Sequence, residues 1–394
     1  MSSAGTAVSR KNAKDLVENA EVVGLVQDLV RIPSVAPKEK AISEYLVNYF
    51  ERMGIPVKTQ ELFPERVNIV ARLKGTGASE PLMFSSHMDV VPVSEAEVPL
   101  WHCDPFSGEI KEGFIWGRGS ADMKGGLAAS MVAMAILARN KIQPNGDIVL
   151  AVTVDEEVLK RGAEGLLQSG LIDDVGHAVI CEPTKMVMHT SCRGRTWGEI
   201  TVLGKTGHTS MKGIGTNAID RMNRLLSLMA SHEIPHTPHP ILGGPHWQPT
   251  MISGGNTPGV VPDWCKVTVD ARMVPGQTSV QMWEEIEKLF AMVQQETGDF
   301  KAEIKVAEKR EPWQTPSEDK LVRVLGNACE SIGLSPETSG FVATTDGSIF
   351  RTGNIVGVIF GPGDLGRCHL ANEALPIDEL IQATKIYAEM MCKW

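Results

Sequence analysis

The chain has 394 residues and a formal net charge of -10 at pH 7. A single hydrophobic core rarely grows beyond about 250 to 300 residues, so a chain of this length is expected to form two domains. The acidic charge argues against nucleic-acid binding, which normally requires a basic surface. No apolar run is long enough for a membrane span, and the N-terminal segment lacks the apolar core of a signal peptide. We therefore expect a cytoplasmic protein.

The seven cysteines are scattered along the chain and form no C-x-x-C pair. A dispersed, odd set of cysteines is typical of a reducing compartment, and it argues against a disulfide framework or a cysteine zinc site. Any metal site must therefore use histidine, aspartate and glutamate.

Helices and strands alternate in the first part of the sequence. The apolar spacing predicts helices at 13–32, 40–54, 123–140 and 162–170, and strands at 68–75, 147–154 and 177–183, with a further strand that ends before Pro92. This alternation is typical of an α/β fold in which crossover helices cover a mostly parallel central sheet.

The pattern changes near residue 188. There the sequence predicts strands at 190–205, 247–255, 264–274 and 300–309, and helices at 216–231 and 279–298. We interpret residues 187–311 as an inserted, smaller α+β domain with two layers. Residues 1–186 and 312–394 then form one discontinuous domain, which closes with a helix at 321–333, a strand at 354–363 and a helix at 377–392.

A histidine and a carboxylate lie side by side at the end of the strand before Pro92. His87 and Asp89 are two residues apart, so their side chains project from the same face of that strand. They are either a structural pair joined by a hydrogen bond or a metal-binding histidine whose other ring nitrogen is held by the aspartate.

Further acidic and histidine side chains follow other predicted strands or the loops that leave them. They are Asp122, Glu156, Glu157, Glu182 and His369. Taken singly, Asp122 could cap a helix, the glutamates could be solvated charges, and His369 could be a surface residue. Together they fall at the sheet edge where α/β proteins build their sites.

Two histidines and several carboxylates without thiolates suit two divalent ions. Zn²⁺ fits this donor set best, with Mn²⁺ or Co²⁺ as alternatives. Two neighbouring ions need a bridging carboxylate, and the isolated Asp122 in its glycine-rich turn is the natural bridge. One of the paired glutamates can then bind metal while the other acts as general base.

A family resemblance rests on motifs found in one order along the chain. These are HMDVVP, GRGSADMKGG, DEE, EPT, GKTGHTSMKGIGTNAI, DARMVPGQT and GPG…H…NE. They resemble the metal-dependent aminoacylase and peptidase family that contains acetylornithine deacetylase, succinyl-diaminopimelate desuccinylase and carboxypeptidase G. The resemblance runs from about residue 20 to the C-terminus, and GRGSADMKGG with a downstream DEE is its most specific part.

The resemblance implies a role for each candidate residue. His87 and Glu182 would hold one metal ion, Glu157 and His369 would hold the other, and Asp122 would bridge the two ions. The resemblance also implies roles for two residues that do not bind metal. Asp89 would orient the metal-bound histidine and Glu156 would deprotonate the bridging water.

The inserted domain of the family serves dimerisation, so the resemblance implies a homodimer. His208 resembles the histidine that reaches the partner subunit's active site and stabilises the oxyanion, and Arg272 resembles the arginine that binds the substrate's carboxylate. Two positions depart from the family pattern. Gly259 stands where an asparagine is common, and Ser86 stands where a glycine usually precedes the histidine.

The resemblance implies hydrolysis of the amide bond of an N-acyl amino acid or a related small, peptide-like amide. Two alternatives remain at this stage. The first is a dipeptidase or another amine-releasing hydrolase with the same metal site. The second is a catalytically silent metal-binding homologue, against which the intact Glu156 argues, because a structural site needs no base.

Overall fold

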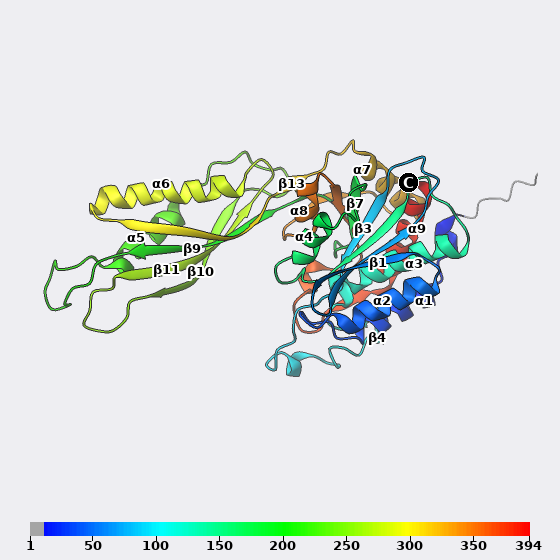
Figure 1. Ribbon diagram of the computed structural model, residues 1–394, viewed down its shortest axis with the longest axis horizontal. Helices are drawn as coiled ribbons and strands as arrows, with labels where there is room; N and C mark the ends of the chain where they lie inside the picture. The colour runs from blue at the N-terminus through cyan, green and yellow to red at the C-terminus, as the bar shows by residue number, and fades with distance from the viewer. Residues whose placement is uncertain (1–11) are drawn as a thin grey trace, which may run out of the picture. The chain divides into compact units, whose positions relative to one another are not determined.

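The computed structural model describes residues 12–394, which divide into two compact units (Figure 1). The first unit contains the residues up to Thr190 together with Thr315–Ser339 and Thr345–Trp394. The second unit contains Ser191–Gln314 and Gly340–Thr344. The second unit is therefore largely one continuous insertion into the chain of the first.

A nine-stranded sheet forms the centre of the first unit, with the order β1-β2-β6-β3-β7-β15-β8-β13 and with β14 paired to β8. The four strands β6, β3, β7 and β15 run parallel, whereas the outer pairs are antiparallel. The strands are β1 (Val57–Phe63), β2 (Arg66–Leu73), β3 (Leu82–His87), β6 (Ile148–Thr153), β7 (His177–Ile180), β8 (Met188–Cys192), β13 (Trp313–Gln314), β14 (Thr338–Phe341) and β15 (Val356–Ile359).

Helices cover both faces of this sheet (Figure 1). One face carries a shared hydrophobic cluster with α1 (Asn19–Val30), α2 (Lys40–Arg52), α3 (Gly125–Arg139), α7 (Lys320–Ser331) and α9 (Ile377–Lys393). On the other face, α4 (Arg161–Gln168) and α8 (Gly347–Phe350) pack against each other. A small antiparallel sheet and short helical turns complete the unit: β4 (Glu109–Lys111), β5 (Phe114–Trp116), β16 (Ala374–Pro376), η1 (Ala13–Leu16), η2 (Val98–Leu100), η3 (Ser120–Lys124), η4 (Arg351–Gly353) and η5 (Leu365–Arg367).

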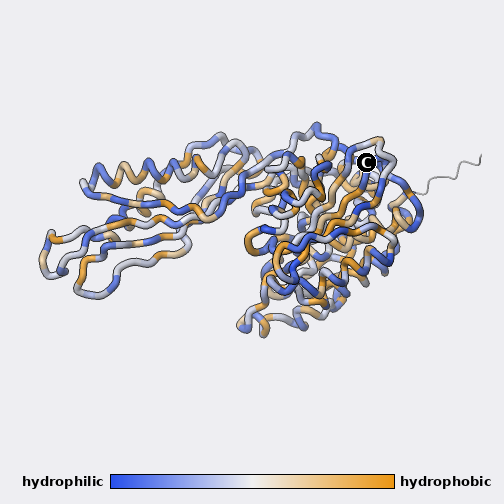
Figure 2. Tube along the Cα trace, viewed as in Figure 1, coloured by the Kyte–Doolittle hydropathy of each residue, from blue (hydrophilic) through white to orange (hydrophobic). Residues whose placement is uncertain are grey.

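Helix α3 is the core helix of the first unit. Every residue from Gly125 to Leu137 is buried, because the helix is apolar on all sides. Among the described residues, Ser120–Arg139 is long and apolar enough to span a membrane by composition, but 94% of that window is buried inside the protein. Figure 2 shows apolar residues concentrated in the inner strands and helices of this unit, which accords with a core helix rather than a membrane segment.

The second unit is an antiparallel sheet with the order β10-β11-β9-β12 and two helices on one face (Figure 1). Residues of β9 and β11 alternate between buried and half-buried, so one face of each strand packs against the helices. The elements are β9 (Gly194–Leu203), α5 (Ala218–Ser231), β10 (His246–Gly254), β11 (Trp264–Met273), α6 (Ser279–Thr297) and β12 (Lys301–Arg310).

The predicted fold class is confirmed: a large, mostly parallel sheet with helices and a separate, smaller antiparallel sheet are both present. Some predicted elements differ in detail. The helix predicted at 13–32 is interrupted, because Val17 and Glu18 have extended backbones between η1 and α1. The strand predicted at 190–205 is divided at Arg193, since β8 pairs in the large sheet and β9 in the small one.

The close contact between α3 and the strand end at Cys181 yields the first prediction. A Cβ added to Gly126 would lie 2.0 Å from the backbone oxygen of Cys181, whereas a Cβ added to Gly24 in α1 meets no atom within 4 Å. Gly126→Ala should lower the free energy of unfolding by about 1–3 kcal/mol, because the added methyl group would overpack the core. Gly24→Ala should raise it by about 0.4–1 kcal/mol. Urea unfolding midpoints measure both changes, and equal midpoints for the two variants would contradict the packing argument.

Candidate metal centre

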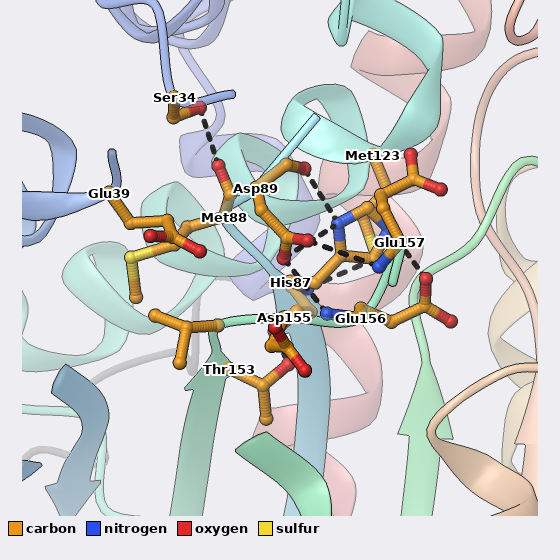
Figure 3. Close-up of polar contacts among 12 residues, drawn as sticks. Ser34, Glu39, His87, Met88, Asp89, Met123, Thr153, Asp155, Glu156 and Glu157 are labelled. Atoms are coloured by element: carbon orange, nitrogen blue, oxygen red, sulfur yellow. Dashed lines mark hydrogen bonds and ion pairs between the residues drawn. The ribbon is translucent and has the colours of Figure 1, made fainter. Parts of the chain in front are cut away.

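His87 ends β3, where both its ring and its backbone N–H have close partners (Figure 3). Its Nδ1 lies 2.9 Å from the backbone oxygen of Asp89, and its backbone N–H donates to Met123 Sδ at 3.2 Å. The other ring nitrogen, Nε2, faces Asp122 Oδ1 at 3.1 Å and Glu182 Oε1 at 3.8 Å. This is the orientation that a metal-binding histidine requires.

Asp122 directs its two carboxylate oxygens to two different histidines. Its Oδ1 faces Nε2 of His87, and its Oδ2 lies 3.3 Å from Nε2 of His369. His369 Nε2 is also 3.1 Å from Glu157 Oε2. The Asp122–Met123 peptide bond is cis.

The predicted metal-binding side chains form two groups that share Asp122. In each group, the potential ligand atoms lie within 4.8 Å of one another. The groups are His87, Asp122 and Glu182, and Asp122, Glu157 and His369. A carboxylate common to two sets of ligands is what a bridged pair of ions needs.

Burial and mutual repulsion control the protonation of these groups. Burial and the charge of Asp122 raise the pKa of Glu157 to about 7 and hold the pKa of Glu182 well above its usual value. Hydrogen bonds with Asp122 and Glu157 raise the pKa of His369 to about 10. Burial lowers the pKa of His87, but the surrounding carboxylates outweigh it and raise that pKa well above its ordinary value. These pKa shifts arise from an excess of negative charge, which bound cations would stabilise.

Asp89 lies beside His87, but the carboxylate of Asp89 has closer partners than the imidazole. Its nearer carboxylate oxygen lies 3.8 Å from His87 Nδ1, so the backbone oxygen of Asp89 rather than its side chain holds the imidazole. The carboxylate accepts instead the backbone N–H groups of Glu156 and Glu157, each at 3.1 Å (Figure 3). Asp89 therefore orients the segment that carries both glutamates. The physical reason is that two convergent amides are better donors for a fully buried carboxylate than one distant ring nitrogen.

Two arginines, one from β2 and one from α4, hold the turn that carries these glutamates. Asp155 has φ 68° and accepts hydrogen bonds from Arg161 Nε and Nη2, both at 2.7 Å, and from Arg66 Nη2 at 3.0 Å. Arg66 also pairs with the buried carboxylate of Glu39. The position of the DEE segment is therefore supported by an ionic network in which Asp155, Arg66 and Glu39 are buried and Arg161 is partly exposed.

Sequence reasoning missed several residues that support the centre. Glu373 accepts the backbone N–H groups of Ala121 and Asp122, each at 3.1 Å, and pairs with Arg118 Nη1 at 2.8 Å. Lys160 Nζ lies 2.6 Å from Glu156 Oε1. Glu373 is the final residue of the GPG…H…NE motif and could have been selected on that ground. Lys160 is an isolated lysine in a polar turn, and no pattern in the sequence singles it out.

His208 and Arg272 belong to the second unit, where each has a local partner. The backbone N–H of Ser210 donates to His208 Nδ1 at 3.2 Å, which leaves the ring proton on Nε2 and makes Nε2 a donor. Arg272 Nε and Nη2 donate to Asp270 at 2.8 and 3.0 Å. Gly259 has φ 88°, and its backbone oxygen accepts the Thr209 N–H beside His208.

Comparisons with known proteins show which family and which proteins this chain resembles. Residues 83–393 match the family described as Peptidase family M20/M25/M40. The chain is 28% identical to N-formyl-4-amino-5-aminomethyl-2-methylpyrimidine deformylase of Halalkalibacterium halodurans, over 95% of this chain and 94% of that protein. It is 31% identical to succinyl-diaminopimelate desuccinylase of Cereibacter sphaeroides, over 84% of this chain and 87% of that protein. A tripeptidase from Staphylococcus aureus shares the fold, with a TM-score of 0.79 at 24% identity and coverage of 95% and 98%.

Glu373, which accepts the backbone N–H of Asp122, shares Arg118 with Glu97, so substitutions of these two glutamates can be compared. Glu373, which is fully buried, and Glu97, which is partly exposed, bind different nitrogens of this guanidinium. Glu373→Gln places an amide NH₂ or an uncharged oxygen against a buried cation and should lower the free energy of unfolding by about 3 kcal/mol. Glu97→Gln should cost clearly less, because Arg118 keeps its buried partner. Chemical denaturation measures both variants, and a larger loss for Glu97→Gln would contradict this assignment.

Proposed function

Because the chain belongs to peptidase family M20/M25/M40, we propose that it hydrolyses the amide bond of an N-acyl amino acid or a related small amide at a centre of two divalent ions. The observation that carries the proposal is the Asp122 carboxylate, which offers one oxygen to each of two histidines. Relatives named deformylase and desuccinylase release an amine from an acyl group, which is the reaction class proposed here.

The donor set fits a pair of borderline divalent ions, with Zn²⁺ as the first choice and Co²⁺ or Mn²⁺ as alternatives. We assign His87 and Glu182 to one ion, Glu157 and His369 to the other, and Asp122 to both. The crowding of buried carboxylates supports this assignment, because their repulsion is relieved by cations.

Such ions supply two chemical effects when bound: they acidify a coordinated water and polarise the scissile carbonyl. We assign proton transfer to Glu156, whose Oε2 lies 4.0 Å from His87 Nε2 and so faces the ligand cluster. This carboxylate takes the proton of the attacking water and returns it to the nitrogen of the leaving amine. Asp89 holds the Glu156 and Glu157 amides, which keeps the base and the neighbouring ligand in fixed register.

His208 and Arg272 are proposed substrate-binding residues. The Nε2–H of His208 is suited to donate to the oxyanion of the tetrahedral intermediate. Arg272 has a guanidinium fork that suits a substrate carboxylate, and in this structure Asp270 occupies two of its donors. Binding of a substrate carboxylate by Arg272 would therefore compete with Asp270 or use the remaining donors.

We further propose a homodimer formed through the second unit. Strand β10 lies at the edge of its sheet and carries the exposed side chains of Met251 and Ile252, a combination that favours strand pairing with another chain. The seven cysteines are dispersed along the chain and form no C-x-x-C pair, which suits the cytoplasmic location that we propose.

The function is tested by amine release from a panel of N-acyl amino acids and dipeptides. The wild type should be active with added Zn²⁺ or Co²⁺ and inactive after removal of metal by a chelator. Glu156→Gln keeps the size of the side chain but cannot accept a proton, so kcat should fall by about 10²–10⁴. Metal content per chain should stay unchanged in this variant, because Glu156 is not a ligand. Near-normal kcat in Glu156→Gln would show that another group is the base.

The ligand assignment is tested by elemental analysis of gently purified protein. We expect about two ions per chain in the wild type and close to one in His369→Ala, because only the second group loses a ligand. His177→Ala is the matched control, since His177 pairs with Glu80 and Asp319 outside the centre. A single ion in the wild type that is unaffected by His369→Ala would contradict the assignment of Glu157 and His369.

A further inference from the structure

We propose that Lys160 is a positioning residue that holds one oxygen of Glu156 so that the other faces the reacting water. The inference rests on the proposed function, since it concerns the residue assigned as general base. It assigns to Lys160 a role that acts through Glu156 rather than through contact with substrate.

The ammonium group of Lys160 holds Glu156 at two points. Its Nζ lies 2.6 Å from Oε1 of Glu156 and donates to the backbone oxygen of the same residue at 3.0 Å. Both residues are 5% exposed, so the pair is shielded from water. A charge-assisted hydrogen bond in such surroundings is stronger and more directional than one on the surface.

This contact makes the two oxygens of Glu156 inequivalent. Oε1 is held by Lys160, whereas Oε2 lies 4.0 Å from Nε2 of His87, within the cluster of candidate ligands. Partial rotation of the carboxylate about its last bond would turn Oε2 away from the cluster. The ammonium opposes that rotation, so a single oxygen is presented for proton transfer.

The backbone of Lys160 is itself fixed. Lys160 has φ 59°, and its N–H donates to the backbone oxygen of Asp155 at 2.7 Å, which closes the turn that contains Glu156. The carboxylate of Asp155 is held in turn by Arg66 and Arg161. Lysine loses much rotamer freedom when it is ordered in this way, and the buried ion pair offsets that loss only with good geometry. The turn supplies that geometry.

A misplaced base impairs the chemical step more than substrate binding. Loss of Lys160 leaves the carboxylate free to spread over several orientations, and few of them place Oε2 correctly for proton transfer. The effect should therefore appear in kcat and leave KM nearly unchanged.

The test compares Lys160→Met with a matched control on the fully metal-loaded enzyme. Lys160→Met keeps an unbranched side chain without charge and should lower kcat by about 10²-fold, with KM within about twofold of wild type and unchanged metal content. Lys393→Met removes another lysine–glutamate pair of the same sequence spacing, Nζ to Glu389 Oε1 at 2.6 Å, in which the glutamate is again buried. It should leave kcat unchanged. If Lys160→Met does not fold, Lys160→Gln is measured in the same way.

Crystal structures of the wild type and Lys160→Met give a readout that is independent of activity. The inference expects the Glu156 carboxylate to leave its wild-type orientation or to occupy several orientations in the variant. An unchanged orientation overturns the inference whether or not kcat falls, and so does a kcat within twofold of wild type. If the wild type releases amine from no substrate of the panel, the proposed function fails, and these structures alone decide the role of Lys160.

Discussion

The arrangement of the centre depends on one constraint, which is the close approach of buried carboxylates at the carboxyl ends of parallel strands. Asp122 lies between the side chains of His87 and His369, with Glu157 and Glu182 on either side. Like charges at such distances raise one another's pKa unless cations intervene, and the pKa values of both glutamates are raised. The repulsion between these groups opposes their close approach, so other contacts within the fold must hold them in place.

The same type of contact supports the candidate ligands at two places: a buried carboxylate accepts hydrogen bonds from two successive backbone amides. The carboxylate of Glu373 accepts the successive amides of Ala121 and Asp122, and the carboxylate of Asp89 accepts those of Glu156 and Glu157. In each case a buried acid from one segment fixes the backbone of another segment at the residue that carries a candidate ligand. The backbone contacts thereby position the side chains of the candidate ligands.

The sequence predicted the fold class and the set of side chains that meet at the sheet edge, because both depend on local patterns. Alternation of apolar runs indicates a parallel sheet, and the carboxyl ends of parallel strands necessarily share one edge. Residues that act across long sequence separations gave weaker signals. Glu373 supports Asp122 from a segment about 250 residues later, and Lys160 looks like a solvated lysine until its turn is seen. The contact between Asp89 and the DEE segment could not be predicted from the sequence, because the spacing along the strand indicates only the pairing with His87.

The two groups of candidate ligands differ in their exposure to solvent, which has a consequence for access. His87, Asp122 and Glu182 are all buried, whereas the side chain of His369 is 50% exposed and is followed by the exposed Leu370. The centre therefore opens to solvent beside His369 and is closed beside His87. A ligand on an exposed loop can move with little disruption of packing, but His87 is fixed between β6 and β7 at the end of β3. The shared Asp122 thus joins a buried group of candidate ligands to a group that solvent can reach.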